Sequence, residues 1–167
     1  MSLAKSFRDL IAYQKQREMA ADVYRITKAF PKEEMYSLTD QVRRSSRSVG
    51  ANLAEAWGKR RYPAHFRSKL TDSIAECHET EHWLLHAFDC KLISQADLSR
   101  FEARLQELER MLNGMIKKTD SFCAPYNDGR VQEQQALYPD YTNDLKPSEP
   151  EKTPSLAKFF TTDSTNT

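Results

Sequence analysis

The sequence is poor in residues that interrupt helices and in residues that build disulfide or metal frameworks. It contains four glycines, and most of its seven prolines lie late in the chain, at positions 125, 139, 147, 150 and 154. The three cysteines are odd in number and lack the paired spacing of a zinc site, which indicates reduced thiols. We therefore expect a cytoplasmic protein with no disulfide framework and no structural metal.

Long apolar runs and catalytic motifs are also missing. No apolar run approaches the roughly 20 residues that a membrane-spanning helix needs, and the N-terminus does not resemble a signal peptide. The sequence shows no glycine-rich phosphate loop, no Ser/His/Asp arrangement and no dinucleotide-binding fingerprint. These absences predict a protein that is not an enzyme, needs no cofactor and does not cross a membrane.

Charged and helix-forming residues are abundant. Charged side chains make up 29% of the chain, and long runs of Leu, Ala, Glu, Lys, Arg and Gln favour an all-α fold. The net charge of +1 hides an asymmetry, because residues 1–122 carry 21 Lys and Arg against 17 Asp and Glu, whereas residues 123–167 carry 4 against 7. A mildly basic body is thus followed by an acidic tail.

Hydrophobic periodicity predicts four helices, over residues 6–30, 37–58, 63–90 and 94–119. Because the connections are short, successive helices should run antiparallel in an up-down-up-down four-helix bundle. We assign residues 1–121 to this bundle. Residues 122–167, acidic and interrupted by proline, are predicted to form a disordered C-terminal tail.

Helix ends and buried faces follow from the same pattern. Ser37 with Asp40 and Ser94 with Asp97 match the S-x-x-D capping motif, Pro63 suits a first helical position, and Gly58 suits a residue just beyond a helix end. In the first helix, Gln16 and Arg17 should lie at the edge of the buried face. The residues expected to face inward there are Leu10, Tyr13, Ala20, Tyr24, Thr27 and Phe30.

The other three helices have clearer apolar faces, and the second combines its face with small side chains. Such side chains let a neighbouring helix approach closely, and Gly50, which costs about 1 kcal/mol of helix stability relative to alanine, implies a packing reason. The expected inward residues are Leu38, Val42, Ser45, Val49, Leu53, Ala56 and Trp57 in the second helix; Phe66, Leu70, Ile74, Cys77, either Glu81 or Leu84, and Phe88 in the third; and Leu98, Phe101, Leu105, Leu108, Leu112 and Met115 in the fourth.

Several motifs in order resemble one known family. The marks are Phe30-Pro31-Lys32-Glu33-Glu34, Leu38-Thr39, Gln41-Val42-Arg43-Arg44, Ser48, Asn52, Ala54-Glu55 and Gly58, then Phe66, Leu70, Ser73, Glu76 and a Leu112-Asn113-Gly114 turn. They are similar to the four-helix-bundle proteins encoded in intervening sequences of bacterial 23S rRNA genes. The resemblance covers residues 7–119 and not the tail.

This resemblance implies more than a fold. Members form ring-like homopentamers, and they are related to accessory proteins of diversity-generating retroelements, which bind nucleic acid and a reverse transcriptase; no catalytic residues are established for the family. The chain departs from the family pattern at four positions. Many members have Pro at the position of Gly50, Gly at that of Ala56, a small residue at that of Gln16 and a helix-ending Gly at that of Lys91.

A basic cluster is the sharpest candidate site. Between Asp40 and Leu70 the chain has eight cations opposed only by Asp40 and Glu55. Such clusters bind phosphates through charge and bidentate guanidinium contacts, so we predict an RNA- or DNA-binding surface without base-specific contacts. The alternative is a solvated turn whose arginines pair with Glu55 or with acids of a neighbouring subunit. The predicted nucleic-acid-binding residues are Arg43, Arg44, Arg47, Lys59, Arg60, Arg61, Arg67 and Lys69.

Two further patterns have structural explanations. Asn52 and Glu55 share a helix face, and a Glu beside Arg43, Arg44 or Arg47 would fix the register between helices or subunits. A catalytic Glu55 is the alternative, but no second acid or nucleophile accompanies it by spacing. His78-Glu79-Thr80-Glu81-His82 matches the zinc-protease motif H-E-x-x-H, and His86 extends the stripe. A third histidine at the metalloprotease spacing is lacking, and Glu102, at a distance where other zinc sites find a third ligand, belongs to the fourth helix of a compact bundle. We therefore interpret this stripe as a polar helix face, with metal binding through His78, His82 and His86 and proteolysis as alternatives.

Overall fold

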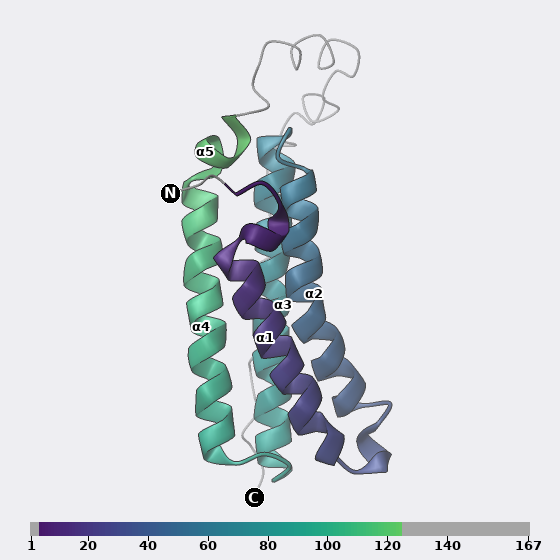
Figure 1. The fold of residues 1–167 in the computed structure, drawn as a ribbon. Helices are drawn as coiled ribbons and strands as arrows, with labels where there is room; N and C mark the ends of the chain where they lie inside the picture. Colours follow the sequence, from purple (N-terminus) through teal and green to yellow (C-terminus); the bar gives the residue numbers. More distant parts are fainter. Residues whose placement is uncertain (1–3, 125–167) are drawn as a thin grey trace, which may run out of the picture. The chain divides into compact units, whose positions relative to one another are not determined.

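The computed structural model describes residues 4–124, and the predicted C-terminal tail lies outside the described residues apart from its first three positions. The four long helices are α1 (Ile11–Ile26), α2 (Leu38–Gly58), α3 (Pro63–Asp89) and α4 (Gln95–Lys117), followed by a short α5 (Thr119–Cys123). Successive long helices run in opposite directions (Figure 1). The all-α, up-down-up-down four-helix bundle is thereby confirmed. Within residues 4–124, no helix is long and apolar enough to cross a membrane.

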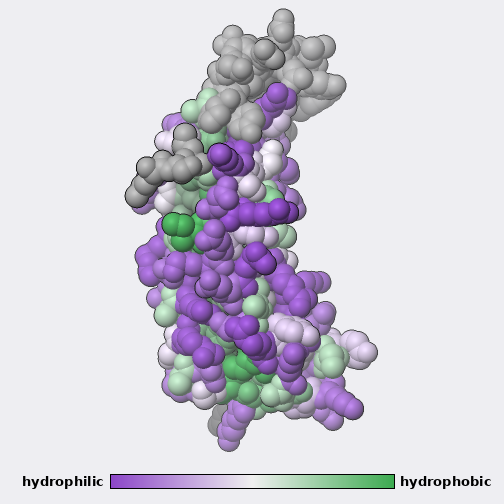
Figure 2. Space-filling model, viewed as in Figure 1, coloured by the Kyte–Doolittle hydropathy of each residue, from purple (hydrophilic) through white to green (hydrophobic). Residues whose placement is uncertain are grey.

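One hydrophobic core runs along the inside of the bundle. All six apolar residues predicted for the fourth helix are buried in α4, and Phe101, Leu108 and Leu112 have essentially no exposed surface. Phe66, Leu70, Cys77 and Leu84 meet them from α3. The outer surface of the side that carries α1 is mainly hydrophilic, with a few separate hydrophobic patches (Figure 2). The amphipathic pattern therefore specifies the packing of these helices correctly.

The first helix is shorter and turned differently from the prediction. Leu10 has extended backbone, with ψ 124°, so α1 begins at Ile11 and is preceded by a 3-10 turn, Phe7–Asp9. A second 3-10 turn, Thr27–Ala29, follows it. The buried residues of α1 are Ala12, Gln16, Met19 and Val23. Tyr24 is exposed and Gln16 is buried, so both of these predictions were wrong. Burial of Gln16 is possible because its Nε2 donates to the Ser46 carbonyl oxygen.

The small residues of α2 bring it close to α3. The Thr80 hydroxyl donates to the Ser45 hydroxyl at 3.0 Å, and the Ser73 hydroxyl donates to the Val49 carbonyl oxygen at 2.7 Å. All three of these polar side chains are buried. The neighbouring helix that was expected to approach α2 closely is therefore α3. Hydrogen bonds between small polar side chains, instead of large apolar side chains, fill the contact.

The helix ends follow the predictions only in part. The Ser94 hydroxyl accepts from the Asp97 backbone N–H at 3.0 Å, as expected, and Pro63 is the first residue of α3. Ser37 makes no capping bond and instead donates to Glu34 at 2.5 Å. Gly58 is the last residue of α2 and has no left-handed conformation, and Gly114 continues α4 instead of forming a turn.

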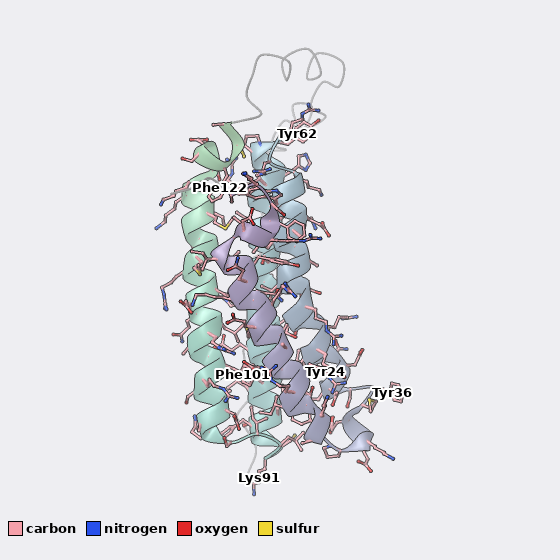
Figure 3. The ribbon with its side chains drawn as sticks, in the orientation of Figure 1. Tyr24, Tyr36, Tyr62, Lys91, Phe101 and Phe122 are labelled. Carbon is pink, nitrogen blue, oxygen red and sulfur yellow. The ribbon has the colours of Figure 1, made fainter. Side chains whose placement is uncertain are left out.

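The fifth helix extends the bundle beyond the predicted boundary at residue 121. Cys123 is fully buried, and the Phe122 ring stacks on Phe66 with 5.6 Å between ring centroids. Figure 3 shows Phe122 and Tyr62 at one end of the bundle and Tyr24 and Tyr36 at the other. We call the first of these ends, where α2 meets α3, the corner end.

Candidate nucleic-acid interface

The corner consists of Lys59, Arg60, Arg61 and Arg67. Lys59 follows the last residue of α2 as its C-cap, its backbone N–H donating to the carbonyl oxygens of Glu55 and Ala56 at 3.0 Å, and Pro63 then starts α3. This tight connection places the four cations close together at the corner end. From Ala56 to Thr71 the sequence contains no acidic residue. The connection itself therefore contributes only positive charge.

Arg60 is held in place by the end of α2. Its guanidinium lies 3.3 Å from the centroid of the Trp57 ring, and its Nε donates to the Trp57 carbonyl oxygen at 2.8 Å. Stacking on an aromatic ring restricts the side chain. Arg60 is thus pre-positioned as a fixed cation at the corner.

The remaining corner cations are exposed. In the part of the chain that the structure describes, Lys59, Arg61 and Arg67 form no ion pair with an acidic side chain. Burial raises the pKa of the neighbouring Cys123 thiol, and the charges of Arg60 and Arg67 oppose that rise. Arg60 and Arg67 therefore lie near the buried Cys123 of α5.

Lys69 has a different role from the other predicted cations. Its Nζ lies 3.0 Å from Glu55, 3.2 Å from Asp72 and 3.3 Å from the Asn52 side-chain oxygen. Hydrogen bonds to Glu55 and then Asp72 raise the pKa of Lys69. Asn52 and Glu55 thus connect α2 to α3 through this lysine, whereas we had expected an arginine partner for Glu55.

The three arginines in the first half of α2 lie away from the corner. Arg47 and Lys59 are separated by twelve residues, which is about 18 Å along a helix. The Arg43 Nε donates to the Thr27 hydroxyl at 2.7 Å, and its guanidinium lies 4.9 Å from the centroid of the Tyr24 ring. Arg44 is exposed and close enough to Glu76 for its charge to oppose the burial that raises the pKa of Glu76. The eight predicted cations therefore form separate groups.

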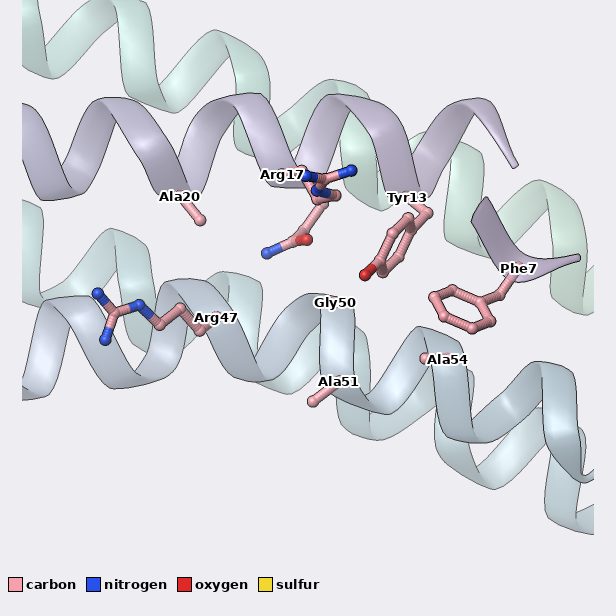
Figure 4. Close-up of a pocket in the computed structure, with 9 residues that line it drawn as sticks. Phe7, Tyr13, Arg17, Ala20, Arg47, Gly50, Ala51 and Ala54 are labelled. Atoms are coloured by element: carbon pink, nitrogen blue, oxygen red, sulfur yellow. The ribbon is translucent and has the colours of Figure 1, made fainter. Parts of the chain in front are cut away.

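A second basic and aromatic group lies where α1 faces α2. The Lys28 Nζ and the Arg47 guanidinium lie 5.0 Å and 5.9 Å from the centroid of the Tyr24 ring. Beside them is a groove of about 380 Å³, which Arg17 and Tyr13 of α1 and Gly50 of α2 help to line (Figure 4). The sequence analysis missed Arg17, Tyr24 and Lys28, although Tyr13, Arg17, Tyr24 and Lys28 recur at helical spacing and could have indicated this face.

The histidine stripe of α3 lies on the surface. His78 approaches Glu109 of α4 at 3.5 Å, and Glu79 accepts a hydrogen bond from the Trp83 indole at 3.2 Å. The His82 and His86 rings contact each other, with 4.5 Å between centroids. Among residues 4–124, no group of three or more His, Cys, Asp or Glu side chains is arranged to hold a metal ion. Glu79, which would be the base of a zinc protease, hydrogen-bonds to tryptophan.

The fold and its basic corner define an up-down four-helix bundle with a cationic end. The family model for the 23S rRNA-intervening sequence protein matches residues 8–114, and the chain belongs to this family. A similar solved structure is that of a protein of unknown function from the S23 ribosomal protein family of Bacteroides thetaiotaomicron. It is 27% identical with a TM-score of 0.58, and the match covers 64% of this chain and 96% of that one. No curated protein matches the chain.

Proposed function

We propose that this protein is a non-enzymatic, oligomeric scaffold that binds the phosphate backbone of RNA or DNA through the corner. The observation that supports the proposal is the group of Lys59, Arg61 and Arg67, exposed and without acidic partners among the described residues. Cations whose charge is not neutralised by the protein displace counterions from a nucleic acid, which favours binding. Arg60, fixed on Trp57, adds a planar donor suited to phosphate.

The proposal narrows the set of predicted binding residues. Lys69 is surrounded by Glu55, Asp72 and Asn52, and Arg43 is bonded to Thr27 and packed on Tyr24. These two side chains would have to give up interactions within the protein in order to contact a phosphate. We therefore assign backbone binding to Lys59, Arg60, Arg61 and Arg67, with Arg44 and Arg47 outside the corner.

Assembly is part of the same proposal. The resemblance to ring-forming homopentamers implies that several copies of the corner lie in one particle. Because each copy adds its positive field to the others, a ring would bind a long nucleic acid more tightly than one bundle does. Backbone contacts do not involve base edges, so binding should depend on salt and strand length more than on sequence.

The test compares two double variants that each remove two positive charges. Lys59→Ala/Arg61→Ala changes the corner, whereas Lys32→Ala/Arg110→Ala removes exposed cations elsewhere. For binding to a labelled heterologous RNA, the corner variant should lose affinity and reduce the slope of log K against log salt by about 1.4, for two single-strand phosphate contacts. Equal affinity of the two variants would refute the proposal. Sedimentation of both variants checks that assembly is unchanged.

A second candidate function is a protein-interaction adaptor, for example for a reverse transcriptase, without direct nucleic-acid binding. An apolar groove of about 540 Å³ between the start of α1 and the end of α4 favours it, and Ile11 beside it is 61% exposed. This function predicts that Ile11→Asp breaks a complex with the reverse transcriptase. The Lys59→Ala/Arg61→Ala variant should then leave that complex intact.

A further inference from the structure

Gln16 presents an unused hydrogen-bond acceptor to the groove between α1 and α2. Its side chain is 3% exposed and its Nε2 donates to the Ser46 carbonyl oxygen at 2.6 Å. No donor within residues 4–124 bonds to its Oε1. The amide nitrogen of Gln16 is thus bonded within the protein, whereas its oxygen has no partner at the groove. Such an oxygen can accept a hydrogen bond from a ligand donor.

Gly50 makes room for this arrangement. A Cβ atom at position 50 would lie 2.2 Å from the Gln16 Oε1, closer than any real contact. Glycine in the middle of a helix is unfavourable. At position 50 it leaves the space that a Cβ atom would fill, and the Gln16 amide group occupies that space. Ala51 and Ala54 also line the groove along α2, and their small side chains leave it open.

The rest of the groove combines an aromatic wall with positive charge. Tyr13 and Phe7 form an edge-to-face pair with 4.8 Å between ring centroids. Figure 4 shows Tyr13 extending from α1 toward α2, with Arg47 at one end of the groove and Phe7 at the other. Arg17 of α1 also lines the groove. No lining residue is acidic, and Arg17 forms no ion pair within the described part of the chain.

We propose that this groove binds one nucleoside phosphate. The base lies against the Tyr13 ring, and an exocyclic amino group of the base donates to the Gln16 Oε1. Arg17 contacts the phosphate, with Arg47 adding charge at the end of the groove. The volume of about 380 Å³ is in the range of small-molecule pockets. Because the Gln16 Oε1 can only accept, the site favours a base that carries an amino donor at that position.

This inference does not rest on the proposed function of the corner. The groove lies between α1 and α2, and none of the four corner cations lines it. The ligand is recognised by its chemistry, which a free nucleotide and a nucleotide within a single strand share. A strand with one base in the groove would give the protein a base preference that the corner alone lacks.

The first experiment is equilibrium dialysis of the full chain with three ligands. They are adenosine 5′-monophosphate, the purine riboside 5′-monophosphate that lacks only the amino group, and ribose 5-phosphate, which lacks the base. We expect adenosine monophosphate to bind with a Kd of about 1 mM or below, and each of the other two about tenfold more weakly. Equal binding of the first two ligands, or no saturable binding of adenosine monophosphate, overturns the proposal.

Variants then connect the binding to the groove. Arg17→Ala removes an exposed side chain and should weaken adenosine monophosphate about tenfold, whereas Arg110→Ala on α4 should leave it unchanged. Gln16→Leu should abolish the preference for the amino group. Gly50→Ala should weaken binding by forcing the Gln16 amide into the groove. Equal effects of Arg17→Ala and Arg110→Ala would contradict the assignment, and thermal unfolding of each variant shows that it is folded.

Two controls separate the source of the nucleotide and the two proposals. If single-stranded oligoadenylate competes with adenosine monophosphate, the ligand is a nucleotide within a strand. If oligoadenylate does not compete, the ligand is a free nucleotide. Both results are consistent with a nucleotide site in the groove. The Lys59→Ala/Arg61→Ala variant should bind adenosine monophosphate normally, and Arg17→Ala should retain the salt-dependent RNA binding of the corner. Loss of nucleotide binding in the corner variant would contradict an independent groove site.

Discussion

Lys91 adopts a backbone conformation that lysine disfavours. Its φ is +59°, and it follows the end of α3. The Leu92 N–H bonds to the Ala87 carbonyl and the Lys91 N–H to the Phe88 carbonyl, each at 2.8 Å. This pair of bonds is the Schellman motif, in which the left-handed residue is usually glycine. The helix end is therefore formed correctly by a residue that is strained in that position.

Lys91→Gly should stabilise the protein by about 1 kcal/mol, because glycine has no Cβ to oppose the left-handed conformation. Urea unfolding followed by circular dichroism measures the change. Lys118→Gly is the matched control: Lys118 ends α4 with φ −104°, so glycine relieves no strain there and should not stabilise. An equal gain from both substitutions would show that the effect is unrelated to backbone conformation.

Gln16 and Gly50 should behave as one unit. In a chain that carries Gln16→Ala, Gly50→Ala should add about 1 kcal/mol through helix propensity. With Gln16 present, that gain should disappear, because the new methyl group displaces the amide and breaks its 2.6 Å bond to Ser46. A double-mutant cycle by urea unfolding should give a coupling of about 1 kcal/mol or more. Additive effects would mean that the two side chains are independent.

The buried face of α1 could not be predicted from periodicity alone. Two neighbouring registers of its sequence both show three- and four-residue steps, and they differ by one residue, which is about 100° around a helix. The prediction placed Tyr24 inside and Gln16 at the edge. The structure reverses both, because tyrosine tolerates an exposed position among cations while Gln16 finds a buried partner in Ser46. That partner is 30 residues away and leaves no local signal.

At the scale of helices, α1 is connected to α4 through charged side chains. Asp22 of α1 is paired with Arg104 of α4 and with Arg25, and the Lys15 Nζ lies 2.9 Å from Glu107. Burial alone would raise the pKa of Asp22, but the hydrogen bonds and charges of the two arginines outweigh it and lower the pKa. The carboxylate form of Asp22 thus stabilises the docking of α1.

Asp22→Asn should lower the free energy of unfolding by about 1 kcal/mol at neutral pH, since the pair is only partly buried. The folded-state pKa lies below the unfolded one, so this contribution is present above the unfolded pKa of about 4 and is lost as the pH falls through the folded value. Urea unfolding of both proteins between about pH 7 and pH 3 should therefore converge.

The control for this prediction is Glu18→Gln, on the same helix but with no ion pair among the described residues. It should cost little at any pH. If the difference between the natural protein and Asp22→Asn stayed constant down to low pH, the charge of Asp22 would not be the cause of its effect.

The predictability of the helices depended on how local their signals are. The apolar face of α4 and its Ser94 cap were predicted correctly, because both depend on residues within one helix. The Ser37 cap failed because Glu34, in the preceding turn, attracts the hydroxyl. The five residues of α5 carry no periodic signal, and Phe66 on a distant helix provides the packing that orders them.

The same distinction applies to the candidate site. The corner could be predicted from sequence since Lys59, Arg60 and Arg61 are consecutive. Two other features could not be predicted, because they depend on contacts between helices. They are the bonding of Lys69 to Asn52 and Glu55, and the groove between α1 and α2. Family resemblance gave the bundle but not which cations face solvent.

At the scale of the whole molecule, charge is divided along the chain. The full chain carries a net +1, whereas residues 1–124 carry 21 Lys and Arg against 17 Asp and Glu. Removing residues 125–167 therefore raises the net charge from +1 to +4. A more positive particle attracts a polyanion over distances up to the Debye length, which is about 30 Å at 0.01 M salt and about 3 Å at 1 M.

A chain ending at residue 124 should accordingly bind heterologous RNA several-fold more tightly than the full chain at low salt. The difference in affinity should vanish near 1 M salt, because screening removes the long-range field. Fluorescence anisotropy over a salt series measures both affinities. The matched control keeps the full length and replaces three acidic residues after position 124 by their amides, which gives the same net charge of +4: Glu149, Glu151 and Asp163. If charge is the cause, this variant should reproduce the low-salt gain in affinity. A gain seen only on truncation would assign the effect to something other than the acidic side chains. A gain that persists at high salt would do the same.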